Sequence, residues 1–397
     1  MAKQPKIRFK GFTEEWKEKK ISDLLLERID MAPQNDAYPL MAFVANKGIV
    51  SKGDRYDRSA LIKDAVNKPY KRTSYGDFIY SSNNLEAGSI GMNFYGNASI
   101  SPVYSIFAPK GDNNPYYLGV RLAMPDVIHE MVRCRQGVVY GQWKIHEDEF
   151  LNISVKMPKP DEQKAISQVI IDLTTTISQR EKELEKLKNI KRALLERMFP
   201  QDGQTTPSIR FKGFTDEWEE KNIGDAFKER DERSGDGELL SVTINSGIRR
   251  AIEMERTFAT GDLNKYKVVK VGDIAYNTMR MWQGACGVSQ YSGIVSPAYT
   301  IAMPQQNQDS VFYAYYFKTN LLLHEFRINS QGLTSDTWNL KYPTFERIRL
   351  FVPIEDEQRK IGSLFAKIDN LLSLRERQLT LFKHTKQALL EQMFVNE

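Results

Sequence analysis

One long amphipathic stretch occurs twice in this sequence, and it constrains the fold more than any other feature. Residues 162–199 and 357–394 align without a gap over 38 positions, of which 15 are identical. Alternate steps of four and three residues from Ile166 or Ile361 meet an apolar side chain at eight of ten positions in each copy. This spacing is typical of a helix that packs along a coiled-coil seam. We therefore expect two long helices, each of roughly 55 Å at 1.5 Å per residue.

The predicted seam consists of the apolar positions of both copies. They are Ile166, Ile170, Leu173, Ile177, Leu184, Leu187, Leu194, Ile361, Phe365, Ile368, Leu372, Leu379, Phe382 and Leu389. Arginine interrupts the seam at matching places, Arg180 and Arg375. Each arginine could pair with Glu183 or Glu376, set the register of the helices or contact a partner protein, and we favour the register.

A second repeat lies ahead of each long helix. Residues 5–28 return as 207–230, with 16 of 24 positions identical. The offset between the copies is 202 here and 195 from Ser101 and Ser296 onward, so the middles of the two halves differ in length as well as in content. A scaffold that is duplicated around different middles predicts two related domains that recognise different targets.

The fold class we expect is mixed α/β, with two globular domains, each followed by a long helix, and with the two helices packed as an antiparallel coiled coil. The predicted boundaries are 1–157 and 207–352 for the domains, 158–199 and 353–397 for the helices, and 200–206 for the linker. Strands are expected at 40–44, 48–52, 77–80, 103–108, 153–158, 239–244, 273–276, 298–302 and 348–353. A helix is expected at 116–132 and another at 311–326.

Composition limits the classes of protein that this chain can be. Its 397 residues are 41% hydrophobic and 27% charged, as in soluble globular proteins, and no apolar run approaches the roughly 20 residues of a membrane span. Two cysteines make no disulfide framework, so we expect a cytoplasmic protein. The net charge of +5 permits a polyanionic partner but does not prove one.

A search for catalytic motifs predicts that this chain is not an enzyme. The sequence has neither the GxxxxGK[ST] nor the GxGxxG loop that binds nucleotide phosphates. Residues 113–116, NNPY, are similar to the [DNS]PP[YFW] element of adenine methyltransferases but lack one proline, and a turn that opens a helix explains them better. Residues 162–164, EQK, suit a helix start better than a nuclease site. The four histidines are scattered, so no metal site is expected.

Basic, amide and aromatic side chains gather in the divergent middles and in two polar loops. Lysine and arginine suit phosphates, and arginine, asparagine and glutamine suit base edges. Ordinary solvated loops remain the alternative. The candidate DNA contacts are Lys52, Arg55, Arg58, Lys71, Arg72, Asn83, Asn84, Gln136, Gln142, Lys144, Arg249, Arg250, Asn277, Arg280, Gln283, Gln331 and Ser335.

Four tryptophans occupy matching positions in the two halves. Trp16 and Trp218 lie in the repeated segments, and Trp143 and Trp338 lie in the polar loops. We expect Trp16 and Trp218 in the cores, because the repeat keeps them identical while the targets would differ. For Trp143 and Trp338 we also favour a core position, with nucleic-acid contact as the alternative.

The motifs at both ends of each half resemble one known family. RFKGFT[ED]EW opens each half, at residues 8–16 and 210–218, and EQ begins each long helix, which ends with ALLE[RQ]MF. This layout, over essentially the whole chain, resembles the specificity subunit of type I restriction–modification systems. The resemblance implies two target recognition domains that read the halves of a split DNA sequence, joined by an antiparallel coiled coil as a spacer.

The resemblance also implies partners. Two methylation subunits would dock on the coiled coil and supply S-adenosylmethionine, and a restriction subunit would supply the ATP-driven motor and the Mg²⁺-dependent nuclease. The chain itself would bind double-stranded DNA and no cofactor, in a bacterial or archaeal cytoplasm. The alternatives are a stand-alone regulatory or architectural DNA-binding protein and an unrecognised methyltransferase.

Overall fold

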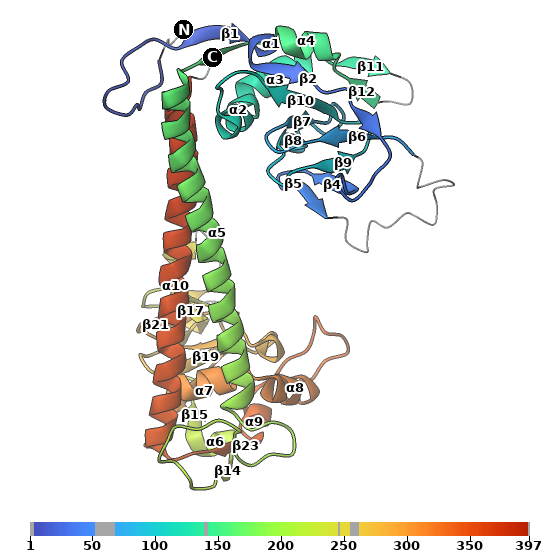
Figure 1. The fold of residues 1–397 in the computed structure, drawn as a ribbon. Coiled ribbons are helices and arrows are strands. Elements are labelled where there is room, and N and C mark those ends of the chain that lie inside the picture. The colour runs from blue at the N-terminus through green and yellow to red at the C-terminus, as the bar shows by residue number, and fades with distance from the viewer. Residues whose placement is uncertain (1–3, 52–67, 139–141, 245–246, 255–261, 396–397) are drawn as a thin grey trace. The chain divides into compact units, whose positions relative to one another are not determined.

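The computed structural model describes residues 4–51, 68–138, 142–244, 247–254 and 262–395. The chain forms two compact units, and Figure 1 shows their elements. Unit 1 comprises Met1–Gln179 and Leu379–Glu397, and unit 2 comprises Arg180–Gln378. The long helices α5 (Pro160–Arg197) and α10 (Glu355–Gln392) each contribute to both units, so the boundary between the units falls within the helices.

A four-stranded antiparallel sheet is the central sheet of unit 1. Its strands follow the order β2 (Leu25–Glu27), β10 (Ser105–Pro109), β7 (Phe78–Tyr80) and β8 (Ile90–Met92). Smaller sheets are β1 (Lys17–Lys20) with β13 (Ser154–Met157), β3 (Met31–Ala32) with β6 (Tyr70–Thr73) and β9 (Ala98–Ile100), β4 (Met41–Val44) with β5 (Gly48–Ser51), and β11 (Gln136–Val138) with β12 (Gln142–Lys144). The shorter helices are α1 (Ile21–Leu24), α2 (Pro115–Leu122), α3 (Pro125–Arg133) and α4 (Glu147–Asn152).

Both faces of the central sheet of unit 1 are covered at its inner strand β7, which explains why this strand is apolar throughout. Phe78 and Tyr80 of β7 belong to a cluster with Phe150 of α4, and the rings of Phe78 and Phe150 stack with centroids 5.7 Å apart. Ile79, between them, belongs to a second cluster with Ile106 of β10. Because successive side chains of a strand point to opposite faces, this short strand supports two clusters at once.

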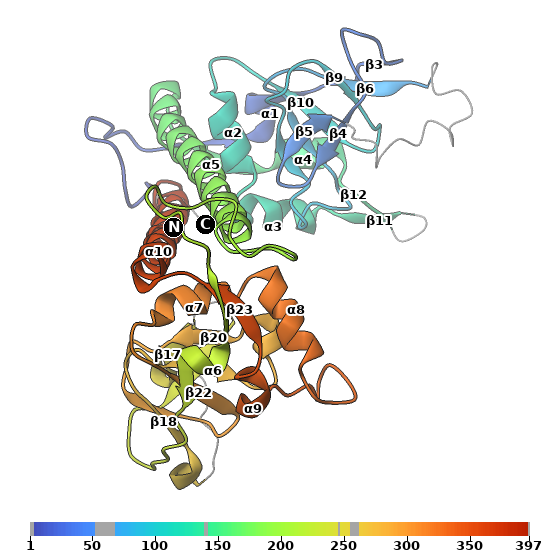
Figure 2. The same cartoon turned by 90° about the horizontal axis from the view of Figure 1, so that it is seen from below.

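Unit 2 repeats this construction with its own residues. Its central sheet follows the order β15 (Phe227–Glu229), β22 (Tyr299–Pro304), β19 (Ile274–Asn277) and β20 (Cys286–Val288), and each strand has a counterpart at the same place in the sheet of unit 1. Smaller sheets are β14 (Glu219–Asn222) with β23 (Arg349–Val352), β16 (Leu240–Thr243) with β17 (Gly247–Arg250), and β18 (Lys267–Val269) with β21 (Gly293–Val295). The helices are α6 (Ile223–Ala226), α7 (Ser310–Tyr316), α8 (Asn320–Ile328) and α9 (Tyr342–Phe345), and α7 lies beside β20 (Figure 2). Three 3-10 helices are η4 (Ala251–Met254), η5 (Leu263–Lys265) and η6 (Met281–Gln283).

The helices expected at 116–132 and 311–326 are each two helices, so that prediction is wrong. In unit 1, Pro125 begins α3, and Met124 before it is extended, with φ −76° and ψ 153°. A proline disfavours helical geometry in the residue that precedes it, which ends α2. In unit 2, Thr319 is extended between α7 and α8, and its hydroxyl donates to the carbonyl of Tyr316 at 2.8 Å. A threonine hydroxyl that bonds to nearby backbone competes with the helix in this way.

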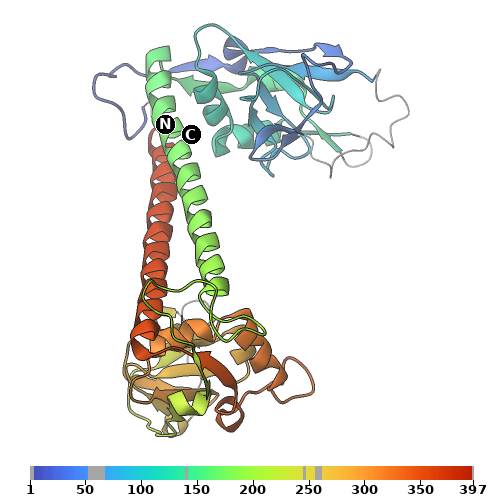
Figure 3. The same ribbon diagram turned by 60° about the horizontal axis from the view of Figure 1, so that its bottom comes forward.

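The parts of α5 and α10 that belong to unit 2 run side by side (Figures 1 and 3). The Lys188 ammonium lies 2.8 Å from the Glu376 carboxylate, and the Lys191 ammonium contacts the Asp369 carboxylate. Since residue numbers rise along α5 while those of the contacted residues fall along α10, the two segments are antiparallel in this unit.

Every apolar position of the predicted seam is buried or partly buried. Arg180 donates to Glu183 of its own helix at 2.8 Å, and Arg375 donates to Gln378 at 3.4 Å. Both contacts lie within one helix. If these arginines set the register of the two helices, as we favoured, they do not do so through these contacts. No described helix, α5 and α10 included, is long and apolar enough to cross a membrane.

A buried ion pair joins the first repeated segment to the start of α5. The Arg8 guanidinium donates from Nε and Nη2 to the two carboxylate oxygens of Glu162 at 2.8 and 2.7 Å, and from Nη1 to the carbonyl of Glu14 at 2.9 Å. The Trp16 indole N–H adds a 3.2 Å hydrogen bond to Glu162, whose residue is only 2% exposed. Glu162 lies in the first turn of α5, where the helix dipole also favours a carboxylate.

Unit 2 contains the same clamp. Arg210 donates to both carboxylate oxygens of Glu357 at 2.9 and 2.7 Å, and to the carbonyl of Asp216 at 2.8 Å. The arginine of the RFKGF motif and the glutamate of the EQ motif are thus partners, which explains why both occur in each half.

The glutamine of each EQ motif fastens the long helix to a neighbouring loop. Gln163 donates to the carbonyl of Pro158 at 3.0 Å and accepts from the backbone N–H of Asn114 at 2.9 Å. Gln358 repeats the donation to Pro353 at 2.9 Å and accepts from the N-cap residue of α7 at 3.0 Å. Asn114 caps α2, so the NNPY sequence opens a helix, as predicted.

Removal of one clamp carboxylate should loosen only the unit that contains it. Glu357→Ala leaves the Arg210 charge buried without its partner, a change that costs about 3–5 kcal/mol of unfolding free energy. Cys286 reports on unit 2, because it is fully buried and burial raises the pKa of its thiol to about 11. We expect Glu357→Ala to accelerate alkylation of Cys286 by about 100-fold or more, measured by peptide mass spectrometry at fixed urea.

Glu162→Ala in unit 1 is the matched control for this experiment. It removes the equivalent carboxylate but should leave the alkylation of Cys286 close to the wild-type rate. Equal acceleration by both variants would contradict the view that each clamp acts within its own unit.

Candidate nucleic-acid interface

Two loops of unit 1 that are distant in sequence are joined by hydrogen bonds. The β11–β12 hairpin lies next to α4 (Figure 1). Its backbone N–H at Trp143 donates to the side-chain oxygen of Asn83 at 2.6 Å, and the N–H of Ile145 donates to the hydroxyl of Ser82 at 3.1 Å. The loop that follows β7 thus anchors the hairpin, and it brings Asn83 and Asn84 beside the hairpin candidates.

The predicted contacts on the hairpin are exposed, but one is already engaged. Gln142 and Lys144 of β12 face solvent, as does Gln136 of β11. The Gln136 amide donates to the Glu149 carboxylate of α4 at 3.1 Å, which fastens the hairpin to the helix. Gln142 and Lys144 are therefore the better placed of the three to bind a ligand.

The core position that we favoured for Trp143 is wrong, whereas Trp16 and Trp218 are buried as expected. Trp143 is 48% exposed, and among the described residues its hairpin forms a sheet of only two strands. Trp338 is partly buried and packs edge-on against Trp282 at 5.1 Å. Sequence spacing places these rings in loops but does not show whether another element covers them.

Unit 2 joins the corresponding two segments by different contacts. The candidate Asn277 ends β19, the segment that follows holds Arg280 and Gln283, and the loop after α8 holds Gln331 and Ser335. The ring contact described above joins the segments, together with a 2.8 Å backbone hydrogen bond from residue 340 to residue 278. In unit 1 the loop after β7 thus lies beside the segment after α3, and in unit 2 the segment after β19 lies beside the loop after α8. Each unit exposes a different set of polar groups there.

Two candidate arginines are held by tyrosine rings. The guanidinium of Arg72 lies 4.6 Å from the ring centre of Tyr38, and that of Arg250 lies 4.6 Å from the ring centre of Tyr291. A stacked guanidinium loses less freedom on binding. Each of these guanidinium groups also faces a carboxylate, since Arg250 Nε lies 3.3 Å from Glu238 and Arg72 Nη1 lies 4.0 Å from Asp30. Lys71 instead donates to the carbonyl of Tyr104 at 2.9 Å, so its charge supports the fold.

The remaining basic candidates fall into two groups. Arg249 of β17 is exposed next to Arg250, on the hairpin that β16 and β17 form. Lys52, Arg55 and Arg58 lie outside the described residues.

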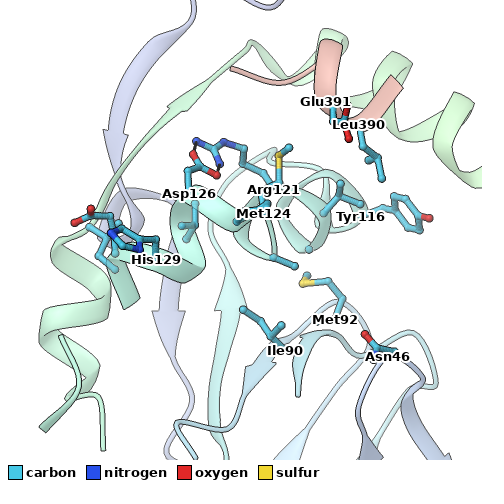
Figure 4. A pocket seen from close by; sticks show the side chains of 18 of the residues that line it. Asn46, Ile90, Met92, Tyr116, Arg121, Met124, Asp126, His129, Leu390 and Glu391 are labelled. Atoms are coloured by element: carbon cyan, nitrogen blue, oxygen red, sulfur yellow. Dashed lines mark hydrogen bonds and ion pairs between the residues drawn. The ribbon is translucent and has the colours of Figure 1, made fainter. Parts of the chain in front are cut away.

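A cavity of about 1500 Å³ lies within unit 1, between α2, α3, β8 and the end of α10 (Figure 4). The buried guanidinium of Arg121 donates to both carboxylate oxygens of Asp126 at 3.0 and 2.8 Å. Lys386 of α10 also lines the cavity, and burial lowers the pKa of its ammonium. The two least exposed charges here neutralise each other, so this cavity is a poorer anion site than the loops. Among the described residues, no three His, Cys, Asp or Glu side chains gather as metal ligands would.

Solved structures with little sequence identity share this fold. The S subunit of a type I restriction–modification system from M. genitalium aligns with a TM-score of 0.58 at 13% identity, over 99% of this chain and 100% of that one. The chain has the fold of a type I restriction–modification S subunit. The family resemblance of the sequence motifs is thereby confirmed at the level of a mixed α/β fold.

Two other similar structures align less closely. The HsdS subunit from Thermoanaerobacter tengcongensis aligns with a TM-score of 0.47 at 14% identity, over 96% of both chains. A chain from a structural study of complex assembly and conformational transition in the type I R-M system aligns with a TM-score of 0.47 at 13% identity, over 96% of this chain and 97% of that one. No protein-family model matches the sequence, and no curated protein does.

Asn83→Ala should release the hairpin from its anchor. The loss of one hydrogen bond, worth about 0.5–1.5 kcal/mol, should make the Trp143 amide exchange about 2- to 10-fold faster, measured by NMR hydrogen exchange. Asn84→Ala is the control, because it shortens an exposed neighbouring asparagine in the same loop. Equal exchange in both variants would show that the Asn83 contact does not hold the hairpin.

Proposed function

We propose that this chain is the non-catalytic, sequence-reading DNA-binding subunit of a type I restriction–modification complex. The observation that carries the proposal is one scaffold built twice, with the same sheet order and the same Arg–Glu clamp, around loops that differ in length and chemistry. A protein that reads two unlike half-sites needs this combination. The fold that it shares with an S subunit supports the proposal.

The exposed loop residues have the chemistry that DNA reading requires. Arginine binds the O6 and N7 atoms of guanine, and glutamine or asparagine binds the N6 and N7 atoms of adenine. Arg280 and Gln142 are exposed in the loop pairs of units 2 and 1, respectively. Lysine and the stacked arginines would bind phosphates, which adds affinity without sequence preference.

In this proposal α5 and α10 form an antiparallel coiled coil that sets the distance between the half-sites. Each helix has 38 residues, which corresponds to roughly 55 Å at 1.5 Å per residue. Half-sites about 34–36 Å apart face the same side of a duplex. The cross-helix contacts of Lys188 and Lys191 support the pairing, because they bind α5 to α10 in one register.

The catalytic steps belong to partner subunits in this proposal. Two methylation subunits would dock on the coiled coil and hold S-adenosylmethionine, and a restriction subunit would hold ATP and Mg²⁺. This assignment is supported by the sequence, which lacks a glycine-rich nucleotide loop. The complex would act in the cytoplasm.

Selection from a pool of random DNA duplexes tests the proposal. The purified full chain should enrich a split motif with an unspecified gap, identified by sequencing of the bound DNA. Exchange of residues 30–133 for the matching region of a protein with another specificity should change one half of that motif only. Enrichment of a single continuous motif, with no methylation subunit retained after co-expression, would favour a stand-alone DNA-binding protein instead.

Longer helices should widen the gap in the motif. Seven residues inserted after Gln179 and seven after Gln378 preserve the heptad pattern and add about 10 Å, or about three base pairs of DNA. We expect the same selection to return both half-sites unchanged, with a gap about three base pairs longer.

Insertion of four residues at the same two places is the control. Four residues shift the apolar seam to another face of each helix, so the pairing and the split motif should be lost. An unchanged gap in the seven-residue variant would contradict the spacer role.

A further inference from the structure

The two faces of the β11–β12 hairpin of unit 1 carry different side chains, and the exposed Trp143 lies on one of them. Strand pairing sets Gly137 opposite Trp143, and it sets Gln136 opposite Lys144 on the other face. That other face is turned toward α4, because Gln136 donates to Glu149 there. At the outer edge of β12, the backbone N–H of Trp143 donates a hydrogen bond to the side-chain oxygen of Asn83. Trp143 therefore lies on the face of the hairpin that is turned away from this contact with α4.

Trp143 is held in a defined place although it is exposed. Its ring lies 4.0 Å from the position that a Cβ of Gly137 would take, so the indole covers the glycine backbone across the hairpin. This pairing of an aromatic ring with a cross-strand glycine stabilises two-stranded sheets. Nearly half of Trp143 still faces solvent, at 48% exposure. Tryptophan is enriched at contact surfaces, because it combines a large apolar ring with a polar N–H.

Unit 2 presents an apolar side chain from the corresponding loop. Leu333 is fully exposed in the loop that follows α8. Backbone hydrogen bonds of 3.0 and 2.8 Å between Gln331 and Asn339 close this loop, and the N–H of Thr334 donates to the hydroxyl of Thr337 at 3.1 Å. Since the loop is internally bonded, Leu333 too is displayed from a defined position.

We propose that Trp143 and Leu333 determine specificity by contacting thymine methyl groups, one in each half-site, in the major groove. The inference rests on the proposed function. A two-stranded β-ribbon is one of the elements that fit a major groove of about 12 Å, and the C5-methyl group of thymine is the apolar feature of the base edges exposed there. Lys144, on the same hairpin and exposed, is placed to meet a flanking phosphate. The polar candidates Gln136, Gln142 and Lys144 share the opposite face, so they would not read the same base pair as Trp143.

The test begins with the split motif that the full wild-type chain selects from random duplexes. Trp143→Ala should lose the preference for thymine at one position of one half-site, by about 3- to 10-fold, the effect of burying a methyl group against an apolar side chain. Leu333→Ala should do the same in the other half-site. Trp143→Phe should keep most of the preference, and Tyr75→Ala, which removes an exposed ring of unit 1 outside the hairpin, should keep all of it.

Replacement of that thymine by uracil isolates the methyl group. Uracil should weaken binding by the wild-type chain about 3- to 10-fold and should not weaken binding by Trp143→Ala further, as measured by fluorescence anisotropy. A Trp143→Ala chain that keeps its thymine preference would overturn the inference. The inference would also be overturned if Trp143→Ala no longer retained a co-expressed methylation subunit but kept its DNA selectivity. Trp143 would then contact a protein and not the DNA. If the wild-type chain selects no split motif, the proposed function fails and this inference fails with it.

Discussion

The rest of the structure depends on the buried pair between an arginine of the N-terminal segment and the glutamate that begins a long helix. Arg8 with Glu162, and Arg210 with Glu357, each make two hydrogen bonds between guanidinium and carboxylate. The geometry matters because a buried charge is stable only when its hydrogen-bonding groups are satisfied. Each clamp fastens the first segment of a half to the start of that half's long helix, 147 or 154 residues later. A helix held at its first turn gives the domain and the helix one fixed relation within a unit.

This rigid frame allows the loops to differ. The core strands of both units occupy the same places in their sheets, and the inner strands β7 and β19 are buried along almost their whole length. The loops after β7 and β19 and after α3 and α8 carry the exposed polar groups, and each pair is held together by its own contacts. In unit 1 the segment after α3 forms the β11–β12 hairpin. In unit 2 the loop after α8 is closed by a single β-bridge between Gln331 and Asn339. Specificity can therefore change in one unit without disturbance of the other, as the proposed function requires.

Much of the architecture was predictable because it follows from periodic or repeated residues. The seam spacing predicted α5 and α10 to within two residues of their observed bounds, and the strands expected at 153–158 and 348–353 are β13 and β23. The tandem helices α2–α3 and α7–α8 were missed, because a single proline or threonine ends a helix through local backbone geometry that an apolar pattern does not record. Among the candidate contacts, Lys71 and Gln136 proved to be bonded within the fold. Residue type indicates what a side chain can bind, but the partners that it finds first depend on elements far away in the sequence.

The sequence by itself determined that there are two related halves, that each ends in a long helix, and that basic and amide side chains gather in their middles. It could do so because repeats, helical periodicity and composition are properties of neighbouring residues. Only the tertiary structure decided which of those residues are free. Glu162 is bonded to Arg8, while Trp143, expected in the core, is 48% exposed on a two-stranded hairpin. Burial is a property of the elements that pack around a side chain, and those elements come together only when the chain is folded.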